Sequence, residues 1–449
     1  MNREQRPWLV LGAVVTGQLM VGVDATILSL AVPEMAADLQ VSARTQAWVL
    51  AGYVLAAGSL MIAGGRLGQA AGYTRAMTIG LIVFGVASGV GGAAQDGATL
   101  IVARVAQGVG AAVMTPAAMA RLSAAFPGAD RARAYGVFGT IMGSGTAIGL
   151  LLGGGLTQLL GWRACMYVNI AFVVVALVLS VLARDRVARS AGHARGGWRG
   201  VLLAVGAASI IQALTSVEQG PRALAFGGVG VAVVAAFVVS DRRAHLPLVP
   251  VVLFRDPVRR VAYLGLFTWG VATITTFVSA SGSLQRDHDL APLVVGALFL
   301  VYPAAIQLGL AVARRRGPRP VTGSIGIGLA LIGLGQAVFA LAPTDLVTAL
   351  VALTLMGVGT SQVMPNASSA MNRDAGPHAG VAGAVGTTLQ QVGGSVGLAA
   401  PVALAAVTGH ATSVGAGLVA LLLVLTSLLA FRTSEAAGRP APRTEGVDV

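Results

Sequence analysis

Long apolar runs dominate the pattern of hydrophobic and polar positions along this chain. Each run holds about twenty residues, which is the length that a helix needs to cross a bilayer core of about 30 Å. Short polar or basic turns separate the runs, unlike the weakly alternating strands of an outer-membrane barrel. The pattern predicts an all-α polytopic membrane protein with about fourteen spans, over residues 8–32, 46–65, 76–95, 99–120, 135–158, 164–183, 200–217, 223–240, 261–284, 291–313, 320–342, 346–366, 380–408 and 412–431.

Loops with several arginines alternate with loops that have few, and this alternation is an independent test of the number of spans. Most of them lie in every second loop, beginning with Arg3 and Arg6. The opposite loops hold only Arg44, Arg163, Arg222 and Arg286. Cytoplasmic loops are enriched in positive charge, and an odd number of spans would break the alternation. Both termini are therefore predicted to be cytoplasmic.

Two long basic linkers, residues 184–199 and 241–260, divide the predicted helices. Residues 1–183 then form an N-terminal six-helix half and residues 261–432 a C-terminal six-helix half, with two linker helices and their basic loops over 184–260. A parallel repeat of two halves is a known plan of transporters. Residues 433–449 are polar and contain proline, so we expect a disordered cytoplasmic tail.

Glycine-rich faces occupy equivalent places in the two predicted halves. The glycines of these faces are Gly145, Gly149, Gly153 and Gly154 in the fifth span and Gly393 and Gly397 in the thirteenth. A spacing of four residues places glycines on one side of a helix, where a neighbouring helix can approach backbone to backbone. We expect both faces to pack at the interface where the halves move against each other.

Composition narrows the class of protein. Of the 449 residues, 55% are hydrophobic and only 10% are charged, against about 25% charged in soluble domains. The net charge of +13 does not indicate nucleic-acid binding, because the arginines are spread over alternate loops. Cys165 is the single cysteine, and the histidines lack metal-ligand spacing. We expect no metal, no nucleic-acid partner and no enzyme activity, since the spans also lack a His, Ser and acid constellation.

Four short motifs carry chemistry. The first span reads Val-Asp-Ala-Thr-Ile-Leu-Ser-Leu-Ala-Val-Pro over residues 23–33, and the fourth reads Arg-Val-Ala-Gln-Gly-Val-Gly-Ala-Ala over 104–112. The others are the turn at 65–75 and the glycine-rich stretch at 139–155. Together they resemble the major facilitator superfamily, specifically its fourteen-span drug:proton antiporter branch. The resemblance implies two six-helix halves, two extra central helices and transport by alternating access.

Two of these motifs depart from the family pattern. In the turn at 65–75 the family places an acid where this chain has Gln69 and basic residues where it has Ala70, Tyr73 and Thr74, while Gly65 and Gly72 match. The resemblance implies that this turn latches the halves, here through hydrogen bonds, helix dipoles and Arg75. In the fifth span Leu150 replaces the proline that follows the matching glycine in the family, so we expect a straighter helix.

Asp24 is the main candidate for proton coupling. It lies about 12 Å below the outer end of the first span, and Arg104 lies about 8 Å below the outer end of the fourth. The two depths favour a pair, direct or through water. Desolvation favours a protonated carboxyl and an approaching arginine favours the ionised one, so Asp24 is predicted to bind and release the coupling proton. The alternative is a permanently ionised Asp24 that only neutralises Arg104.

Other polar and aromatic groups inside the spans are candidates for a substrate cavity. They either line the cavity or bond and pack against neighbouring helices. These residues are Trp48, Tyr53, Gln107, Met114, Asn169, Gln307 and Gln390; Trp269, Tyr302, Gln212 and Gln391 are further candidates of the same kind.

The sequence thus favours a proton-driven exporter of drug-like or secondary-metabolite compounds in a bacterial inner or plasma membrane. A nucleotide-binding Gly-x-x-x-x-Gly-Lys-Ser/Thr loop is absent from the sequence, so the proton gradient takes the place of a cofactor. Because only one acid lies deep in the N-terminal half, we expect hydrophobic substrates that are neutral, weakly acidic or monocationic, and we expect a monomer. The alternatives are proton-coupled uptake of a nutrient and a membrane sensor that does not transport.

Overall fold

The computed structural model describes residues 5–126, 129–183, 198–245, 247–317, 319–342, 345–373, 379–408 and 411–438. Within these ranges all regular secondary structure is helical. The N-terminal half consists of α1 (Gln5–Asp38), α2 (Ala43–Ala71), α3 (Tyr73–Gly92), α4 (Gly97–Ala125), α5 (Ala129–Leu160) and α6 (Trp162–Ala183). Between the halves lie α7 (Trp198–Thr215), η1 (Val217–Gln219), α8 (Pro221–Arg242) and η2 (Val251–Phe254). The C-terminal half consists of α9 (Pro257–Arg286), α10 (Pro292–Phe299), α11 (Val301–Arg316), α12 (Val321–Leu341), α13 (Leu346–Asn372), α14 (Ala379–Thr408) and α15 (Ala411–Gly438).

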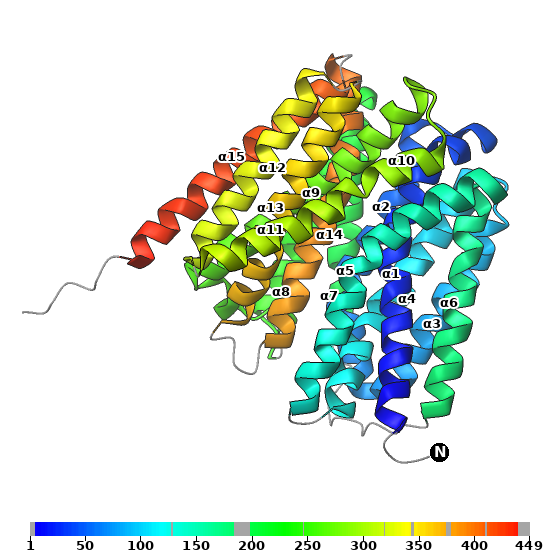
Figure 1. Cartoon of the computed structure of the whole chain (residues 1–449), viewed down its shortest axis with the longest axis vertical. Helices are drawn as coiled ribbons and strands as arrows, with labels where there is room; N and C mark the ends of the chain where they lie inside the picture. The colour runs from blue at the N-terminus through cyan, green and yellow to red at the C-terminus, as the bar shows by residue number, and fades with distance from the viewer. Residues whose placement is uncertain are drawn as a thin grey trace, which may run out of the picture.

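Eleven helices in the described part of the chain are long and apolar enough to cross a membrane, with Pro292–Arg316 counted as one span. The helices α5, α14 and α15 occupy the other three predicted spans. Figure 1 shows α1–α6 and α9–α15 as two bundles that lean together at one end of the molecule. The all-α fold and the arrangement in two halves agree with the sequence prediction.

Two predicted elements differ in detail from the structure. The span expected over 291–313 is present as Pro292–Arg316, but it is interrupted at Leu300, because α10 ends at Phe299 and α11 begins at Val301. Pro303 explains the break, since proline has no N–H to continue the helical hydrogen bonds of the preceding turn. Residues 433–438, expected to belong to a disordered tail, instead continue α15 to Gly438, and the rest of the expected tail, residues 439–449, lies outside the described part of the chain.

Helix starts repeat between the halves. Asp96 accepts a hydrogen bond from the backbone N–H of Thr99 at 2.9 Å at the start of α4, and Asp345 accepts one from Thr348 at 2.9 Å at the start of α13. A carboxylate in this position satisfies an N–H that the helix itself leaves free. The bonds from Thr99 lower the pKa of Asp96, so this cap stays ionised to a more acidic pH than an ordinary aspartate would.

Glycine contacts repeat in the same way. Gly149 and Gly153 of α5 lie on the backbone of Val23 and Ile27 of α1, where a Cβ on Gly153 would be 2.7 Å from the Ile27 carbonyl oxygen. Gly393 and Gly397 of α14 lie in the same way on the backbone of Phe267 and Val271 of α9. Gly393 and Gly397 correspond to Gly149 and Gly153, and Phe267 and Val271 correspond to Val23 and Ile27. In all four pairs the two residues are separated by the same number of positions in the sequence. The packing of the fifth helix on the first is therefore duplicated.

The halves meet along two seams. At one seam α5 packs on α10, where Gly154 lies against the backbone of Pro292 and Leu293. At the other α2 packs on α14, where the Thr388 hydroxyl donates to the Gly58 carbonyl oxygen at 2.7 Å. Near α1 the halves are also joined by Ser281, whose hydroxyl donates to the Ser29 carbonyl oxygen at 3.0 Å.

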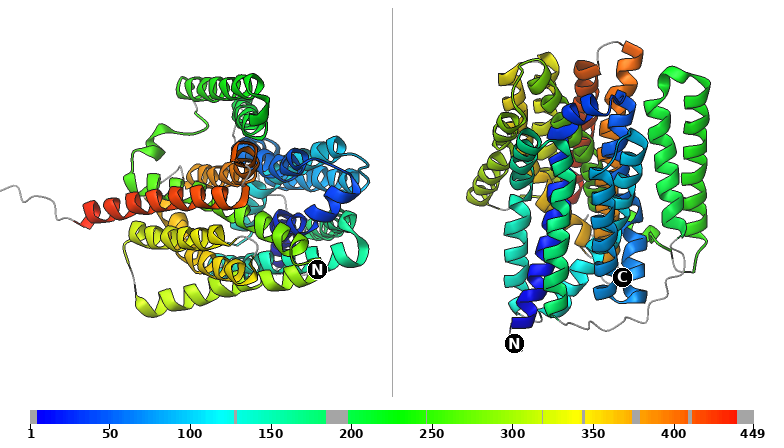
Figure 2. Two further views of the ribbon diagram at one scale, coloured as in Figure 1. Left: turned by 90° about the horizontal axis from the view of Figure 1, so that it is seen from above. Right: turned by 90° about the vertical axis from the view of Figure 1, so that its right-hand side faces the viewer.

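The hairpin of α7 and α8 stands beside one bundle face rather than inside the bundle (Figure 2). It is attached mainly through α7, which contacts both α2 and α14. The Trp48 indole donates to the Gln212 side chain at 2.9 Å, and the Arg44 guanidinium donates to the Thr215 carbonyl oxygen at 2.7 Å. The two extra helices thus cover one of the two seams.

Candidate functional site

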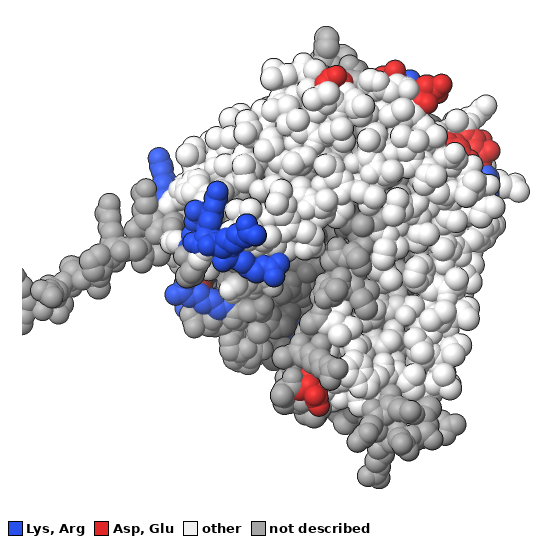
Figure 3. Space-filling view, viewed as in Figure 1, with Lys and Arg blue, Asp and Glu red and all other residues white. Residues whose placement is uncertain are grey.

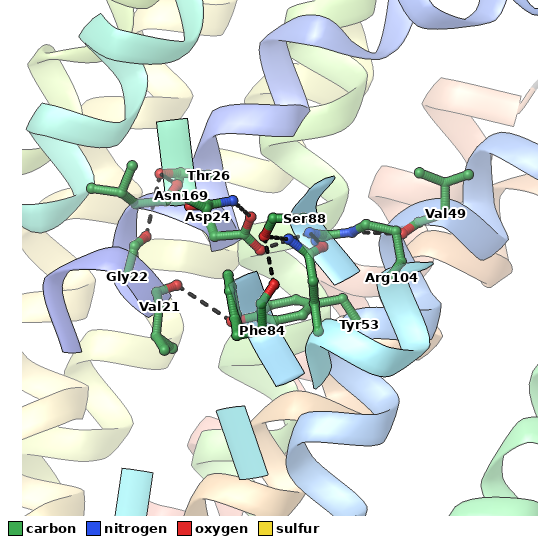
Figure 4. Close-up of polar contacts among 12 residues, drawn as sticks. Val21, Gly22, Asp24, Thr26, Val49, Tyr53, Phe84, Ser88, Arg104 and Asn169 are labelled. Carbon is green, nitrogen blue, oxygen red and sulfur yellow. Dashed lines mark hydrogen bonds and ion pairs between the residues drawn. The ribbon is translucent and has the colours of Figure 1, made fainter. Parts of the chain in front are cut away.

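A buried ion pair lies in the N-terminal half. The Arg104 guanidinium of α4 donates to one carboxylate oxygen of Asp24 of α1 at 2.7 Å, and the Asn169 amide of α6 donates to the other at 2.7 Å. Figure 4 shows the three side chains converging from different helices. The sequence predicted the depth of Asp24 and Arg104, and the fold places them in direct contact.

A second layer fixes Arg104. Its guanidinium donates to the Gln107 amide oxygen at 2.7 Å and to the Val49 carbonyl oxygen at 3.2 Å. Gln107 in turn donates to the Ser88 hydroxyl at 2.7 Å. The Tyr53 ring lies 4.4 Å below the guanidinium carbon, which adds a cation–π contact. Arg104 is therefore held on several sides, and Ser88 and Val49 are members that the sequence did not indicate.

Burial makes this cluster energetically sensitive. Asp24 is 0% exposed and Arg104 1% exposed. Removing one partner of such a pair leaves an uncompensated buried charge, which costs about 3–5 kcal/mol. The Asn169 amide oxygen is buried and has no hydrogen-bond partner among the described residues. Asn169 thus has an unused acceptor directly beside the carboxyl group.

A cavity of about 1110 Å³ lies between the halves and touches this cluster through Arg104. Most of its lining belongs to α9, α11, α13 and α14 of the C-terminal half, and α1 and α2 supply the rest of the N-terminal side. The volume suits a drug-sized molecule. Since Arg104 both lines the cavity and holds Asp24, the ion pair and the cavity form one site.

Aromatic and hydroxyl groups line the C-terminal wall. The Trp269 indole donates to the Thr360 hydroxyl at 2.8 Å, and the Tyr302 hydroxyl lies 3.2 Å from the same oxygen. Phe277 lies edge-on to Tyr302, with ring centroids 5.1 Å apart. Thr360 gave no signal in the sequence, because a threonine in an apolar span more often bonds its own helix.

The structure divides the predicted cavity residues. Gln307 and Gln390 line the cavity. The remaining five lie outside its lining, so the expectation that they line it does not hold in this conformation: Trp48, Tyr53, Gln107, Met114 and Asn169. Each has another use nearby, because Trp48 bonds to α7, Met114 packs in the core of the N-terminal half, and the other three surround the ion pair.

The predicted latch does not join the halves here. Gln69 and Arg75 are exposed, and neither has a hydrogen bond or ion pair with a described residue. Gly72 adopts a φ of 93° between α2 and α3, a conformation that favours glycine. Gly65 faces Pro116, 3.6 Å from where a Cβ would lie. The turn therefore shapes the end of the N-terminal half.

The predicted glycine faces lie where close packing requires them. Gly149 and Gly153 contact α1, Gly154 contacts α10, and a Cβ on Gly145 would lie 3.5 Å from Leu19. Gly393 and Gly397 of α14 contact α9. α5 is an unbroken helix through Leu150, at the position where the resembling family has proline.

Comparison with known proteins shows which proteins this chain resembles in sequence. The family model described as Major Facilitator Superfamily matches residues 14–398. The puromycin resistance protein pur8 of Streptomyces alboniger is 35% identical over 411 residues, covering 88% of this chain and 81% of that protein. The lincomycin resistance protein of Streptomyces lincolnensis is 32% identical over 423 residues, covering 90% and 85%.

Two further similarities extend the comparison. The cephamycin export protein CmcT of Amycolatopsis lactamdurans is 31% identical over 414 residues, covering 89% of this chain and 84% of that protein. The crystal structure of the POT family transporter PepTSo has a TM-score of 0.73 at 15% identity, covering 97% of this chain and 99% of that one. At this identity the structural likeness concerns the fold.

Two helical halves around a central cavity define the class of secondary membrane transporters. The family match over most of the chain then settles the assignment: this chain belongs to the Major Facilitator Superfamily. It is a multi-pass membrane protein.

Proposed function

We propose that this chain exports drug-like or antibiotic and secondary-metabolite compounds in exchange for protons, by alternating access. The observation that carries the proposal is the buried pair of Asp24 and Arg104 at the edge of the central cavity. An ionisable pair inside a membrane is a functional site by default, because its burial is costly. The names of the relatives, which include resistance to puromycin and lincomycin and export of cephamycin, support the same function.

Coupling works through the charge of Asp24. In the ionised state Asp24 holds Arg104 and Asn169. A proton that binds to Asp24 removes its negative charge, so the attraction that holds Arg104 in place weakens. Arg104 keeps its bonds to Gln107 and Val49 and becomes available at the cavity edge. Proton binding at Asp24 and ligand contact at the cavity edge are thus linked through one arginine.

The arginine distribution supports an orientation with both termini in the cytoplasm of a bacterial cell. The cavity then opens towards the cytoplasm, because the contacts between Ser281 and Ser29 and between Gly154 and Pro292 close the opposite end. In this proposal the protein works as a monomer in the bilayer, uses the proton gradient without a cofactor, and catalyses no chemical reaction. Its partners are small hydrophobic substrates and lipid, and not nucleic acid.

Flux in proteoliposomes tests the proposal. Purified protein is reconstituted, a pH gradient is imposed, and the movement of a panel including puromycin, lincomycin and cephamycin is followed. We expect at least one compound to accumulate only while the gradient lasts. Asp24→Asn is the matched variant, because it keeps the shape of the side chain and removes its titration, and we expect it to abolish gradient-driven flux.

The alternatives predict different outcomes. Movement of a compound in the direction of the protons would indicate uptake instead of export. A complete lack of gradient-dependent flux for the panel would favour a sensor. Unchanged flux in the correctly folded Asp24→Asn variant would place proton coupling elsewhere.

A further inference from the structure

We propose that the central cavity selects neutral or anionic compounds and rejects organic cations. This inference rests on the proposed export function, because it names the substrate class of the same site. It is narrower than the sequence-based expectation, which also allowed monocations. The selectivity depends on which charged groups reach the lining of the cavity.

The charged side chain that reaches the lining of the cavity is a cation. Among the described residues that line it, Arg104 is the ionisable cation and none is Asp or Glu. Asp24 lies directly behind Arg104, but it is 0% exposed and both of its carboxylate oxygens are occupied by Arg104 and Asn169. Arg104 is itself only 1% exposed, so a ligand in the cavity touches the edge of its guanidinium, and Arg314 of the adjoining pocket supplies the exposed positive charge.

A smaller pocket of about 590 Å³ extends the cavity towards the basic end of the molecule. It shares Leu310, Ser361 and Pro365 with the cavity and adds Arg314, with no acid in its described lining. Arg315 and Arg316 follow on the exposed end of α11. Figure 3 shows this group of basic side chains together on one face, whereas most acidic side chains on that face lie at the opposite end.

The rest of the lining suits uncharged acceptors and anions. Gln307, Gln390 and Gln391 carry amide groups that can donate to carbonyl, phenolate or carboxylate oxygens. Trp269, Phe277 and Tyr302 supply ring surfaces for a flat apolar body. A cation that loses its hydration on entering the cavity finds no carboxylate in the described lining to replace it, which is unfavourable. Ring faces attract cations, but this attraction is smaller than that cost.

Two dyes with the same tricyclic ring system separate the possibilities. Fluorescein is anionic at neutral pH and rhodamine 123 is cationic. We expect purified protein to bind fluorescein at least tenfold more tightly than rhodamine 123, measured by fluorescence anisotropy in detergent. Equal or tighter binding of rhodamine 123 would overturn the inference. Because binding needs no pH gradient, selective binding of fluorescein without any transport would refute the export function and leave the charge selectivity standing.

A charge introduced into the lining provides the matched test. Gln390→Glu adds a carboxylate to the cavity, and we expect at least a fivefold loss of fluorescein affinity and a gain in rhodamine 123 affinity. Gln158→Glu makes the same change at an exposed position of α5 outside both linings, and we expect no change in either affinity. Equal effects of the two variants, or no effect of Gln390→Glu, would contradict the inference.

Discussion

The two halves share their packing and differ in their chemistry. Asp24 follows Val23 in the N-terminal half, and Thr268 follows the equivalent Phe267 in the C-terminal half. Gly108 lies on the backbone of α2 as Gly357 does on that of α11. Four residues before each glycine stand Arg104 and Leu353, respectively.

At these equivalent positions the two halves have different roles. Thr268 satisfies its hydroxyl within its own helix, by donating to the Leu264 carbonyl oxygen at 3.0 Å, and Leu353 is a buried core residue. The C-terminal half instead supplies most of the cavity wall. One half therefore carries the ionisable pair and the other carries most of the ligand contacts, on the same helical frame.

The largest effect is expected when the ion-pair residues of the N-terminal half are replaced by their counterparts in the C-terminal half. Arg104→Leu leaves Asp24 buried without its partner, so we expect a loss of about 3–5 kcal/mol in the free energy of unfolding. The double variant Asp24→Thr/Arg104→Leu holds no buried charge, and we expect its stability to return to within about 1 kcal/mol of the parent. Unfolding in mild detergent measures both.

Transport separates charge from packing in the same variants. We expect the double variant to fold and to show no proton-driven flux. Gradient-driven flux in the double variant would show that the division of work is wrong, since neither half would then need the pair.

Glycine contacts test whether the shared packing matters equally in both halves. Gly149→Val and Gly393→Val each force a branched side chain against a neighbouring backbone, and overpacking of this kind costs about 1–3 kcal/mol. We expect both variants to transport poorly, and by similar amounts. Leu150→Pro is the comparison within α5, and we expect it to impair transport less than Gly149→Val. The reverse order would mean that the helix needs the bend of a proline more than the glycine face.

Asn169 differs from its counterpart in the C-terminal half. Val173 contacts Gly85, and Leu423 contacts Gly333 in the same way. Asn169 lies four residues before Val173 and Val419 lies four residues before Leu423, so Val419 is the counterpart of Asn169. Asn169→Leu removes a donor from the ionised carboxylate of Asp24, which costs about 1–3 kcal/mol. The protonated form is then favoured, so we expect the pH dependence of transport to move to higher pH. A fall in transport at every pH with no such shift would make Asn169 a packing residue.

The smallest effect is expected at Thr268, the counterpart of Asp24. Thr268→Val removes a hydroxyl that bonds only to its own helix among the described residues. We expect a loss of about 1 kcal/mol or less in the free energy of unfolding and unchanged flux. A loss of coupling comparable to that of Asp24→Asn would mean that the C-terminal half also takes part in proton transfer.

The sequence by itself determined the class of fold, the repeat and the ion pair. A bilayer requires apolar runs of a set length, so these runs give the number of spans. The alternation of arginines between loops gives their orientation, and the two glycine-rich spans indicate the repeat. The depths of Asp24 and Arg104 followed in the same way from the rise of a helix per residue.

Only the tertiary structure decided which side chains face the cavity. Tyr53, Gln107 and Asn169 are polar or aromatic residues at suitable depths, yet they turn towards the ion pair, while Thr360 and Ser361 line the cavity. Depth along a span does not give the rotation of a helix about its axis, because that rotation is set by packing against neighbouring helices. The break at Leu300 follows from the missing N–H of Pro303. A hydropathy pattern does not indicate it, because proline leaves the apolar run continuous.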